Sequence, residues 1–233
     1  MHGGSRMKEL QGCGSIAIVD NDKTVLWALG NALRSILPDC PVIWTADSGF
    51  TAIARARSVG SCPDLLLLDM SLGDINGPMV CREIRKQADR PAILAMTSFP
   101  LADYAQDAAN AGAQGIVAKQ GDFGELERAV RSILDERRGC YRTAGVNVDF
   151  QTSHEAFMRV RSEKESGVEA LSVRESEVIR LSTEGCTSEQ IAKRLDIAKA
   201  TVDTLFQRAC RKTGASNRVE LAILWYKQYG RNR

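Results

Sequence analysis

Four polar residues directly follow short apolar runs in this sequence: Asp20, Asp69, Thr97 and Lys119. Such runs are typical of buried strands, and the carboxyl ends of parallel strands meet at one edge of an open sheet. Two carboxylates can hold a divalent cation, a hydroxyl can donate to a phosphoryl oxygen, and an ammonium group can neutralise its charge. The spacing therefore predicts a site for a divalent cation and a phosphoryl group.

The elements that must bring these residues together alternate along the first 139 residues. Strands are expected at 15–20, 42–45, 65–69, 92–96 and 115–118, and helices at 22–36, 47–59, 77–88, 101–112 and 122–137. This alternation predicts an α/β domain at 15–139 with a doubly wound, five-stranded parallel sheet and helices on both faces. Because the crossovers are right-handed, the strand carboxyl ends share one edge, where the four polar residues converge.

Length and composition fit a protein of two domains. A chain of 233 residues with 44% hydrophobic content can build two cores. No apolar run approaches the roughly 18 residues of a membrane span. Residues 1–14 lack the apolar stretch of a signal peptide, so we expect a disordered leader on a cytoplasmic protein without a membrane partner. The seven cysteines are scattered and odd in number, which favours reduced thiols over a metal site.

Charge is distributed unevenly along the chain. Residues 1–139 hold 15 Lys and Arg against 17 Asp and Glu, a net of −2, whereas residues 140–233 hold 16 against 12, a net of +4. From Lys199 onward, eight basic residues accompany only two acidic ones. A basic C-terminal end is suited to an acidic polymer.

The composition changes after residue 139. The stretch 140–168 is polar and contains a charged cluster at 159–165, which indicates a linker with a short helix around 153–164. Beyond it, residues 169–233 show the pattern of an all-α domain with four short helices.

Local signals mark where each of the four helices begins. Capping boxes, in which a side chain and a backbone amide bond reciprocally across the first turn, begin the first two helices. The expected starts are Ser172 with Glu175, Thr187 with Gln190, residue 199 for a helix that ends at 213, and Ser216. The third helix has an inward stripe of Val202, Leu205, Phe206, Ala209 and Thr213. The apolar positions of the fourth are Val219, Leu221, Ala222, Leu224 and Trp225.

The strand-end residues of the first domain resemble those of the receiver domain of two-component response regulators, which has a flavodoxin-like fold. The resemblance covers roughly residues 15–137 and implies that Asp69 is the phosphoacceptor, that Thr97 follows the phosphate and that Lys119 pairs with it. It further implies a Mg²⁺ pocket. The residues expected at that pocket are Asp20, Asn21, Asp22, Asp69 and Ser71, the last through its backbone carbonyl.

The chemistry that this resemblance implies is physically consistent. A carboxylate is a poor nucleophile towards phosphate because like charges repel, and Mg²⁺ removes that repulsion. Lys119 adds a second positive charge for the transition state, and the product is an aspartyl phosphate.

Three positions depart from the receiver pattern. Asn21 stands where a second carboxylate is usual, so the pocket loses a negative charge and Mg²⁺ binding is expected to be weaker unless Asp22 contributes. Ile116 occupies the aromatic switch position, so a ring movement coupled to Thr97 is not available there. Gly73 replaces a usual proline and loosens the loop after Asp69.

The second domain resembles the LuxR-type helix-turn-helix of the NarL/FixJ regulators. The resemblance is carried by Leu171-Ser172-Val173-Arg174-Glu175, Glu184-Gly185-Cys186-Thr187, Ile191-Ala192, Ala200-Thr201-Val202 and Ser216-Asn217-Arg218. An α-helix fits the major groove, where Gln reads adenine and Arg reads guanine. The expected groove-facing residues are Asp203, Thr204, Gln207, Arg208 and Arg211. The expected phosphate contacts are Lys199, Thr201, Lys212 and Arg218.

Together these features predict a cytoplasmic, DNA-binding transcriptional response regulator that phosphorylation of Asp69 switches. Its expected partners are double-stranded promoter DNA, a cognate histidine kinase or a small phosphodonor, and a second copy of the chain in a homodimer. The alternative is a phosphorylation-independent DNA-binding protein whose degenerate receiver responds to a ligand or a partner protein. A heterodimer with another regulator is a further, narrower hypothesis.

An enzyme is the third class of function considered. A phosphatase with an Asp nucleophile needs an acid/base carboxylate two residues after it, and Ser71 occupies that position. We therefore expect no turnover of an external substrate. Among the aromatic residues, Trp27 and Trp44 are expected to pack in the core or between helices, and Trp225 to pack the last helix or contribute to a dimer.

Overall fold

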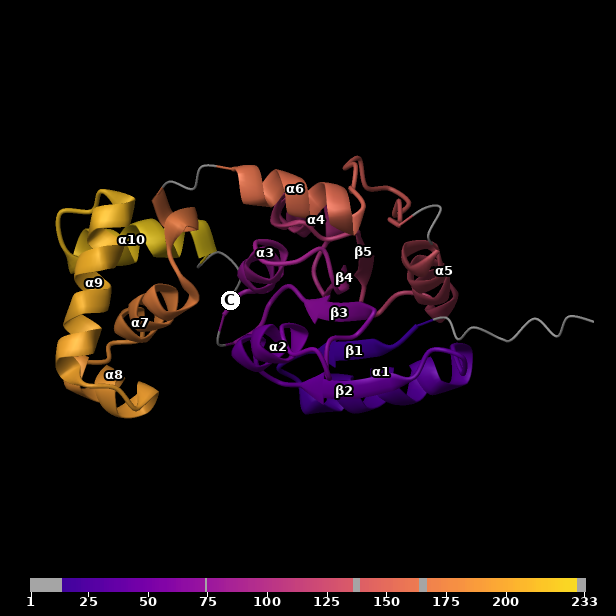
Figure 1. Cartoon of the computed structure of the whole chain (residues 1–233), viewed down its shortest axis with the longest axis horizontal. Helices are drawn as coiled ribbons and strands as arrows, with labels where there is room; N and C mark the ends of the chain where they lie inside the picture. The colour runs from indigo at the N-terminus through magenta and orange to yellow at the C-terminus, as the bar shows by residue number, and fades with distance from the viewer. Residues whose placement is uncertain (1–13, 74, 136–138, 164–166, 230–233) are drawn as a thin grey trace, which may run out of the picture.

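The computed structural model describes residues 14–73, 75–135, 139–163 and 167–229 (Figure 1). Its first domain contains a five-stranded parallel sheet in the order β2-β1-β3-β4-β5. The strands are β1 (Ile16–Val19), β2 (Val42–Ala46), β3 (Leu65–Asp69), β4 (Ala92–Thr97) and β5 (Gly115–Ala118). The predicted doubly wound fold is confirmed, and each strand lies within one residue of its expected bounds.

Helices cover both faces of the sheet. They are α1 (Lys23–Ile36), α2 (Gly49–Ala56), α3 (Gly77–Arg85), α4 (Leu101–Ala111) and α5 (Phe123–Leu134). Helices α1 and α5 share one apolar core with alternate residues of the strands, and α2, α3 and α4 share the other. The leucines of β3 show the cause, since Leu66 and Leu68 enter the second core while Leu65 and Leu67 enter the first.

The loop that follows Asp69 is fixed by local chemistry. Asn76 caps α3 by accepting a hydrogen bond from the Met79 amide at 2.9 Å. A Cβ atom on Gly77 would lie 2.3 Å from the Asp69 carbonyl oxygen, so only glycine lets α3 begin this close to the end of β3. The start of α3 therefore supports the backbone of the candidate phosphoacceptor.

The stretch whose composition indicates a linker packs against the first domain over residues 139–163. The Tyr141 amide donates to the Gln114 carbonyl oxygen at 2.8 Å, and the Thr143 hydroxyl donates to the carbonyl oxygen of Ile116 in β5. Helix α6 (Ser153–Ser162) follows and packs on α3 (Figure 1). An ion pair of 2.7 Å joins Arg82 on α3 to Glu163.

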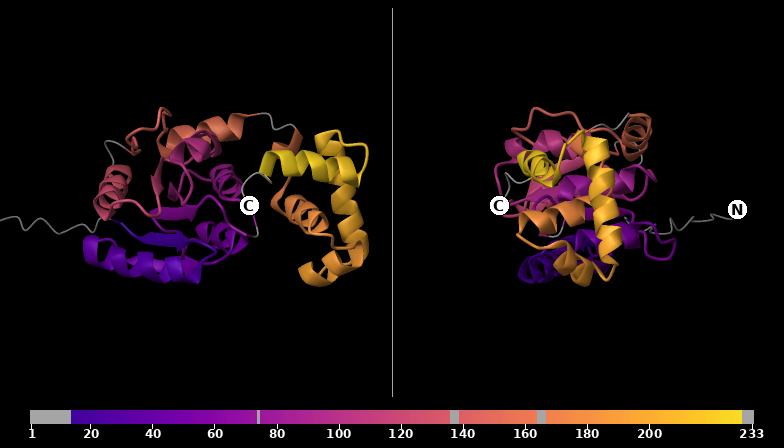
Figure 2. Two further views of the ribbon diagram at one scale, coloured as in Figure 1. Left: turned by 180° about the vertical axis from the view of Figure 1, so that it is seen from behind. Right: turned by 90° about the vertical axis from the view of Figure 1, so that its left-hand side faces the viewer.

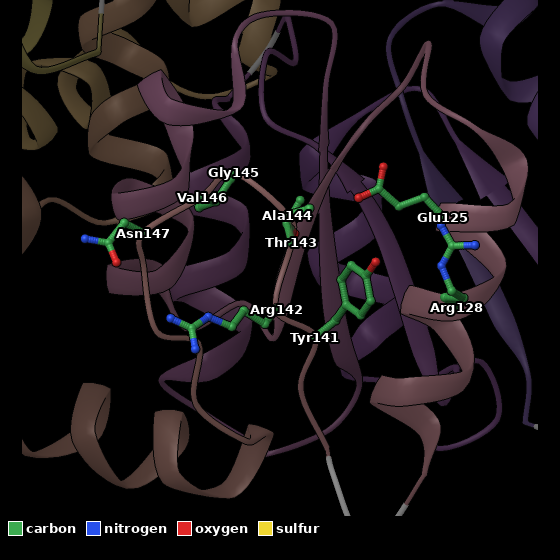
Figure 3. A pocket seen from close by; sticks show the side chains of 9 residues that line it. All are labelled: Glu125, Arg128, Tyr141, Arg142, Thr143, Ala144, Gly145, Val146 and Asn147. Atoms are coloured by element: carbon green, nitrogen blue, oxygen red, sulfur yellow. The ribbon is translucent and has the colours of Figure 1, made fainter.

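A hollow of about 760 Å³ lies between this packed segment and α5. Figure 3 shows Glu125 and Arg128 of α5 on one side and residues 142–147 on the other, with the Tyr141 ring between them. None of the residues that line the hollow belongs to the predicted phosphoryl site.

The second domain is all-α. Its elements are η1 (Gly167–Ala170), α7 (Val173–Thr183), α8 (Ser188–Leu195), α9 (Lys199–Thr213) and α10 (Arg218–Tyr229). Both expected capping boxes are present, at the starts of α7 and α8. The last helix begins later than Ser216, because the Asn217 side chain accepts from the amides of Val219 and Glu220.

Two expectations from the sequence are wrong. Trp27 has an exposed fraction of 73% and packs in no core, because the buried face of α1 is formed by Leu29, Gly30 and Leu33 and Trp27 lies on the other side of the helix. Cys40 is disulfide-bonded, whereas reduced thiols were expected throughout. Among the described residues, no helix is long and apolar enough to cross a membrane.

Candidate phosphoryl site and nucleic-acid interface

Two carboxylates and one ammonium group meet at the carboxyl edge of the sheet. Lys119 Nζ lies 2.9 Å from Asp69 Oδ1 and 2.7 Å from Asp20 Oδ2. The two carboxylates are buried and the ammonium is largely buried, with exposed side-chain fractions of 0% for Asp20, 2% for Asp69 and 11% for Lys119. The structure therefore brings together three of the four residues that follow the apolar runs.

Thr97 completes this group. It is fully buried at the end of β4, where its neighbour Met96 pairs with Asp69 in the register of the sheet. Its carbonyl oxygen accepts from the Lys119 amide at 2.9 Å. The parallel register therefore places Thr97 at the end of β4, which pairs with the strand of Asp69, and Lys119 directly after the next strand, β5.

The donor set fits a hard divalent cation. Asp20 Oδ1 accepts from the Asp22 amide at 2.9 Å, and the buried Oδ2 atom has the Lys119 ammonium, 2.7 Å away, as its one partner among the described residues. An oxygen in that state is suited to a cation, since Mg²⁺ prefers carboxylate and carbonyl oxygens. Asp20, Asp69 and the Ser71 carbonyl are the groups that would hold it.

Electrostatics at Asp69 combine opposing effects. Burial raises the pKa of the Asp69 carboxyl, and the nearby Asp20 charge acts in the same direction. The Lys119 ammonium and the Ser71 amide, which donates to Asp69 Oδ1 at 3.1 Å, oppose this rise. Lys119 and the Ser71 amide therefore favour the charged form of Asp69, which burial and Asp20 disfavour.

The remaining candidate cation ligands occupy different positions. Asn21 is exposed, with its side-chain nitrogen towards Gly73. Asp22 caps α1 by accepting from the Thr24 amide at 2.7 Å, and that hydrogen bond lowers the pKa of the Asp22 carboxyl. One Asp22 oxygen is therefore occupied by the helix start.

Two aromatic residues that sequence reasoning missed adjoin this site. The Tyr104 hydroxyl of α4 lies 3.1 Å from Ser71 Oγ, and the Phe99 ring stacks on Tyr104 with a centroid separation of 5.8 Å. The Phe99 amide donates to Thr97 Oγ1 at 3.1 Å. Only the two-residue offset of Phe99 from Thr97 hints at this arrangement in the sequence. Ile116, where an aromatic residue is usual, is buried in the core.

The second domain presents a helix-turn-helix. Helix α8 is followed by its C-cap residue Asp196, which adopts a left-handed backbone with φ of 51°, and α9 begins at Lys199. The inward face of α9 is as expected, with Val202, Phe206 and Ala209 buried. Figure 2 shows α9 at the end of the molecule away from the sheet.

The nine predicted DNA contacts fall into two groups. Five have exposed side chains and no ion pair with another described residue; these are Thr201, Thr204, Gln207, Arg208 and Arg211. The other four are engaged within the domain. Lys199 pairs with Glu189, Lys212 pairs with the buried Glu175 at 2.8 Å, and Arg218 pairs with Asp203 at 2.6 Å.

Lys212 therefore has a structural task that its sequence position does not reveal. Glu175 is 3% exposed and accepts from the Ser172 amide at 2.7 Å in the capping box of α7. The ammonium of Lys212 neutralises this buried carboxylate and so ties α9 to the start of α7.

A carboxylate and ammonium cluster at the carboxyl edge of a parallel sheet, joined to a helix-turn-helix, defines the class of two-domain DNA-binding response regulators. Comparison with known families agrees with both halves. Residues 16–131 match the response regulator receiver domain, and residues 169–225 match the bacterial regulatory proteins of the LuxR family.

Individual relatives match along most of the chain. The DNA-binding transcriptional activator DevR/DosR of Mycobacterium tuberculosis is 30% identical, over 89% of this chain and 92% of that protein. The nitrate/nitrite response regulator NarL of Escherichia coli is 26% identical, over 92% and 95%. DesR, a transcriptional regulatory protein of Bacillus subtilis, is 26% identical, over 93% and 98%.

The chain belongs to the NarL/FixJ family of response regulators, in which a receiver domain is joined to a LuxR-type DNA-binding domain. It is accordingly a DNA-binding transcription regulator, and its relatives are regulators of this kind rather than enzymes. Receiver domains generally bind Mg²⁺, which agrees with the oxygen donors around Asp69.

Proposed function

We propose that phosphorylation of Asp69 switches this regulator and that it binds promoter DNA as a dimer. The observation that carries the proposal is the contact of one largely buried ammonium, Lys119, with the two buried carboxylates Asp20 and Asp69. A structural ion pair needs only one carboxylate, whereas an acceptor site needs a nucleophile and a cation ligand side by side.

The chemistry at Asp69 requires few groups. An Asp69 oxygen forms a bond to phosphorus while the bond from phosphorus to the donor breaks, and the donor leaves as histidine of a kinase or as acetate from acetyl phosphate. Lys119 exchanges its contact with Asp69 for one with a phosphoryl oxygen. When bound, Mg²⁺ would neutralise the charge that builds up between the carboxylates and the phosphoryl group.

Thr97 offers a route by which phosphorylation of Asp69 moves residues outside the site. Its hydroxyl can donate to a phosphoryl oxygen while it still accepts from the Phe99 amide, so the backbone at Phe99 follows it. Phe99 in turn stacks on Tyr104 of α4. Movement of this pair replaces the ring movement that Ile116 cannot make.

The last helix supports the dimer. Val219, Ile223 and Tyr226 have exposed fractions of 70%, 50% and 56%, and their spacing places them on one face of α10. On the opposite face, Leu221 is fully buried in the core of the domain. An exposed apolar stripe on an otherwise packed helix is suited to the same stripe of a second copy.

Phosphorylation is tested by treating the full chain with acetyl phosphate and Mg²⁺ and measuring the intact mass. Wild type should gain roughly 80 Da, the mass of one phosphoryl group, and Asp69→Ala should not. Asp103→Asn, which alters an exposed carboxylate of α4, should keep the adduct. EDTA should prevent it in every variant, because the acceptor depends on the cation.

The same experiment separates the two modes of control. If wild type gains no mass at any Mg²⁺ concentration, the receiver is degenerate and a ligand or a partner protein controls DNA binding. Asn21 and Ile116 are the residues that favour this second mode.

The dimer is tested by sedimentation of the phosphorylated chain over a range of concentrations. Ile223→Asp should shift the protein towards monomer and weaken binding to a two-site promoter duplex, because the charge would be buried in the contact. Met158→Asp, the same change at an exposed residue of α6, should leave both unchanged. Equal behaviour of the two variants would contradict a dimer through this stripe.

A further inference from the structure

Asp203 is an acidic residue on the outer part of a helix that meets DNA. It lies in the second turn of α9, and its Oδ1 atom is 2.6 Å from Arg218 Nη2. Ser188, at the start of α8, donates to the same oxygen at 3.3 Å and accepts from Arg218 Nη1 at 2.8 Å. We call this three-helix contact of Ser188, Asp203 and Arg218 the clasp.

The clasp holds Arg218 on several sides. Both terminal nitrogens of the guanidinium are bonded within it, and the guanidinium carbon lies 4.1 Å from the centre of the Phe206 ring. The side chains of Arg218 and Asp203 remain 45% and 39% exposed, so DNA can reach the pair. Arg218 is thus near the surface, but its charge is turned towards α9.

The clasp changes the charge that the domain offers to a phosphate backbone. Of the five basic residues between 199 and 218, three are paired with carboxylates, and Arg208 and Arg211 form no ion pair with another described residue. Lys212 neutralises a buried carboxylate. Only the ion pairs of Lys199 and Arg218 can therefore be exchanged for contacts with DNA phosphates. Arg218 is the better donor to a phosphate, because its planar fork can bond two oxygens at once.

We propose that Asp203 attenuates DNA affinity by keeping Arg218 in the clasp, so that sequence-independent binding is weak and recognition depends on the outer face of α9. The carboxylate repels the phosphate backbone and competes with it for the same guanidinium. Asp203 is therefore a specificity-determining residue that acts through Arg218 and needs no base contact of its own. This inference rests on DNA binding by the second domain and is independent of phosphorylation at Asp69.

The test uses the full chain and a 30-base-pair duplex of random sequence, with binding followed by fluorescence anisotropy between 50 and 200 mM salt. Asp203→Asn keeps an oxygen for Ser188 and Arg218 but removes the charge. We expect roughly five- to tenfold tighter binding at the lowest salt, and a plot of log affinity against log salt that is steeper by about 0.9, the value for one additional phosphate contact.

A double-mutant cycle assigns the gain to Arg218. Arg218→Gln in the wild-type background should change the salt slope little, whereas in the Asp203→Asn background it should remove the added slope. Asp196→Asn is the matched control, because Asp196 lies at the turn before α9, forms no ion pair with another described residue, and has a left-handed backbone that asparagine tolerates. Thermal unfolding of each variant verifies that the domain is folded.

The outcomes are distinct. The inference is overturned if Asp203→Asn binds no tighter than wild type, if Asp196→Asn gives the same gain, or if Arg218→Gln flattens the slope equally in both backgrounds. A wild type and variants that all fail to bind at 50 mM salt would overturn DNA binding itself and this inference with it. Binding by wild type with no change at position 203 would overturn the inference alone.

Discussion

Asn21 is the neutral residue at one position of the predicted cation pocket. A carboxylate there would attract Mg²⁺ more strongly, although exposure of the side chain to solvent limits the gain. We expect Asn21→Asp to lower the Mg²⁺ concentration for half-maximal phosphorylation by roughly tenfold. The measurement is the initial rate of the mass gain over a Mg²⁺ series.

The control is another exposed asparagine. Asn31→Asp adds the same charge to α1, at an exposed position whose side chain accepts a hydrogen bond from Arg34. A comparable shift in both variants would mean that the added charge acts at long range and that Asn21 has no specific place near the cation.

Arg85 has a purely structural role. It is fully buried, and its guanidinium donates to the carbonyl oxygens of Ala88, Pro91 and Gly112 and to Gln114 Oε1. Arg85→Met should lower the free energy of unfolding by about 2–4 kcal/mol, because buried acceptors lose their donor. Urea unfolding followed by circular dichroism measures the loss.

Arg57→Met is the matched change for Arg85. Arg57 is 42% exposed and pairs with Glu83 at 3.8 Å, so we expect a loss within about 0.5 kcal/mol. If the two variants were equally stable, the hydrogen bonds of Arg85 would contribute no more than a surface pair.

At the scale of elements, α9 lacks the side chain that begins its neighbours. Ala198 occupies the N-cap position with φ of −68° and ψ of 146°, but it forms no capping hydrogen bond, whereas Ser172 and Thr187 cap α7 and α8. Ala198→Ser should therefore raise the free energy of unfolding of the domain by about 1 kcal/mol. The shift of the urea midpoint measures the gain.

Ala200→Ser is the control for this cap. It adds the same hydroxyl inside the first turn of α9, where serine is a poorer helix former than alanine, and should give no gain. A gain of equal size in both variants would show that hydration, rather than capping, stabilises the helix start.

Elements were also what the sequence predicted best. The apolar runs predicted every strand, because β1 and β3 are buried along their whole length and even the partly exposed edge strand β2 keeps apolar residues. The reciprocal side chains of Ser172 and Thr187 identified two helix starts. Side-chain partners were harder to predict. The pairing of Asp203 with Arg218, and of Tyr104 with Ser71, joins residues 15 and 33 positions apart, and no local pattern records such contacts.

At the scale of the whole molecule, composition described residues 140–168 as a polar linker, but the fold uses the few apolar side chains of residues 140–163. Val146, Ala156 and Val160 are 8%, 0% and 2% exposed, and all three lie at positions that a polarity average conceals. The Arg159 guanidinium also donates to the carbonyl oxygens of Ala109 and Asn110 at the end of α4. The segment therefore stabilises the receiver, and the chain continues from it into the second domain.

This packing predicts where a stable receiver fragment must end. A fragment of residues 14–163 should unfold cooperatively, whereas one of residues 14–139 should be at least about 3 kcal/mol less stable, because it exposes the edge of β5 and the surface beneath α6. A fragment that ends at residue 152 keeps the contacts of Tyr141, Thr143 and Val146 but lacks α6, and should be intermediate. Equal urea midpoints for all three fragments would mean that the segment packs on the receiver without stabilising it. A graded loss would make α6 part of the receiver, so that a shift of α4 reaches the DNA-binding domain through a packed helix.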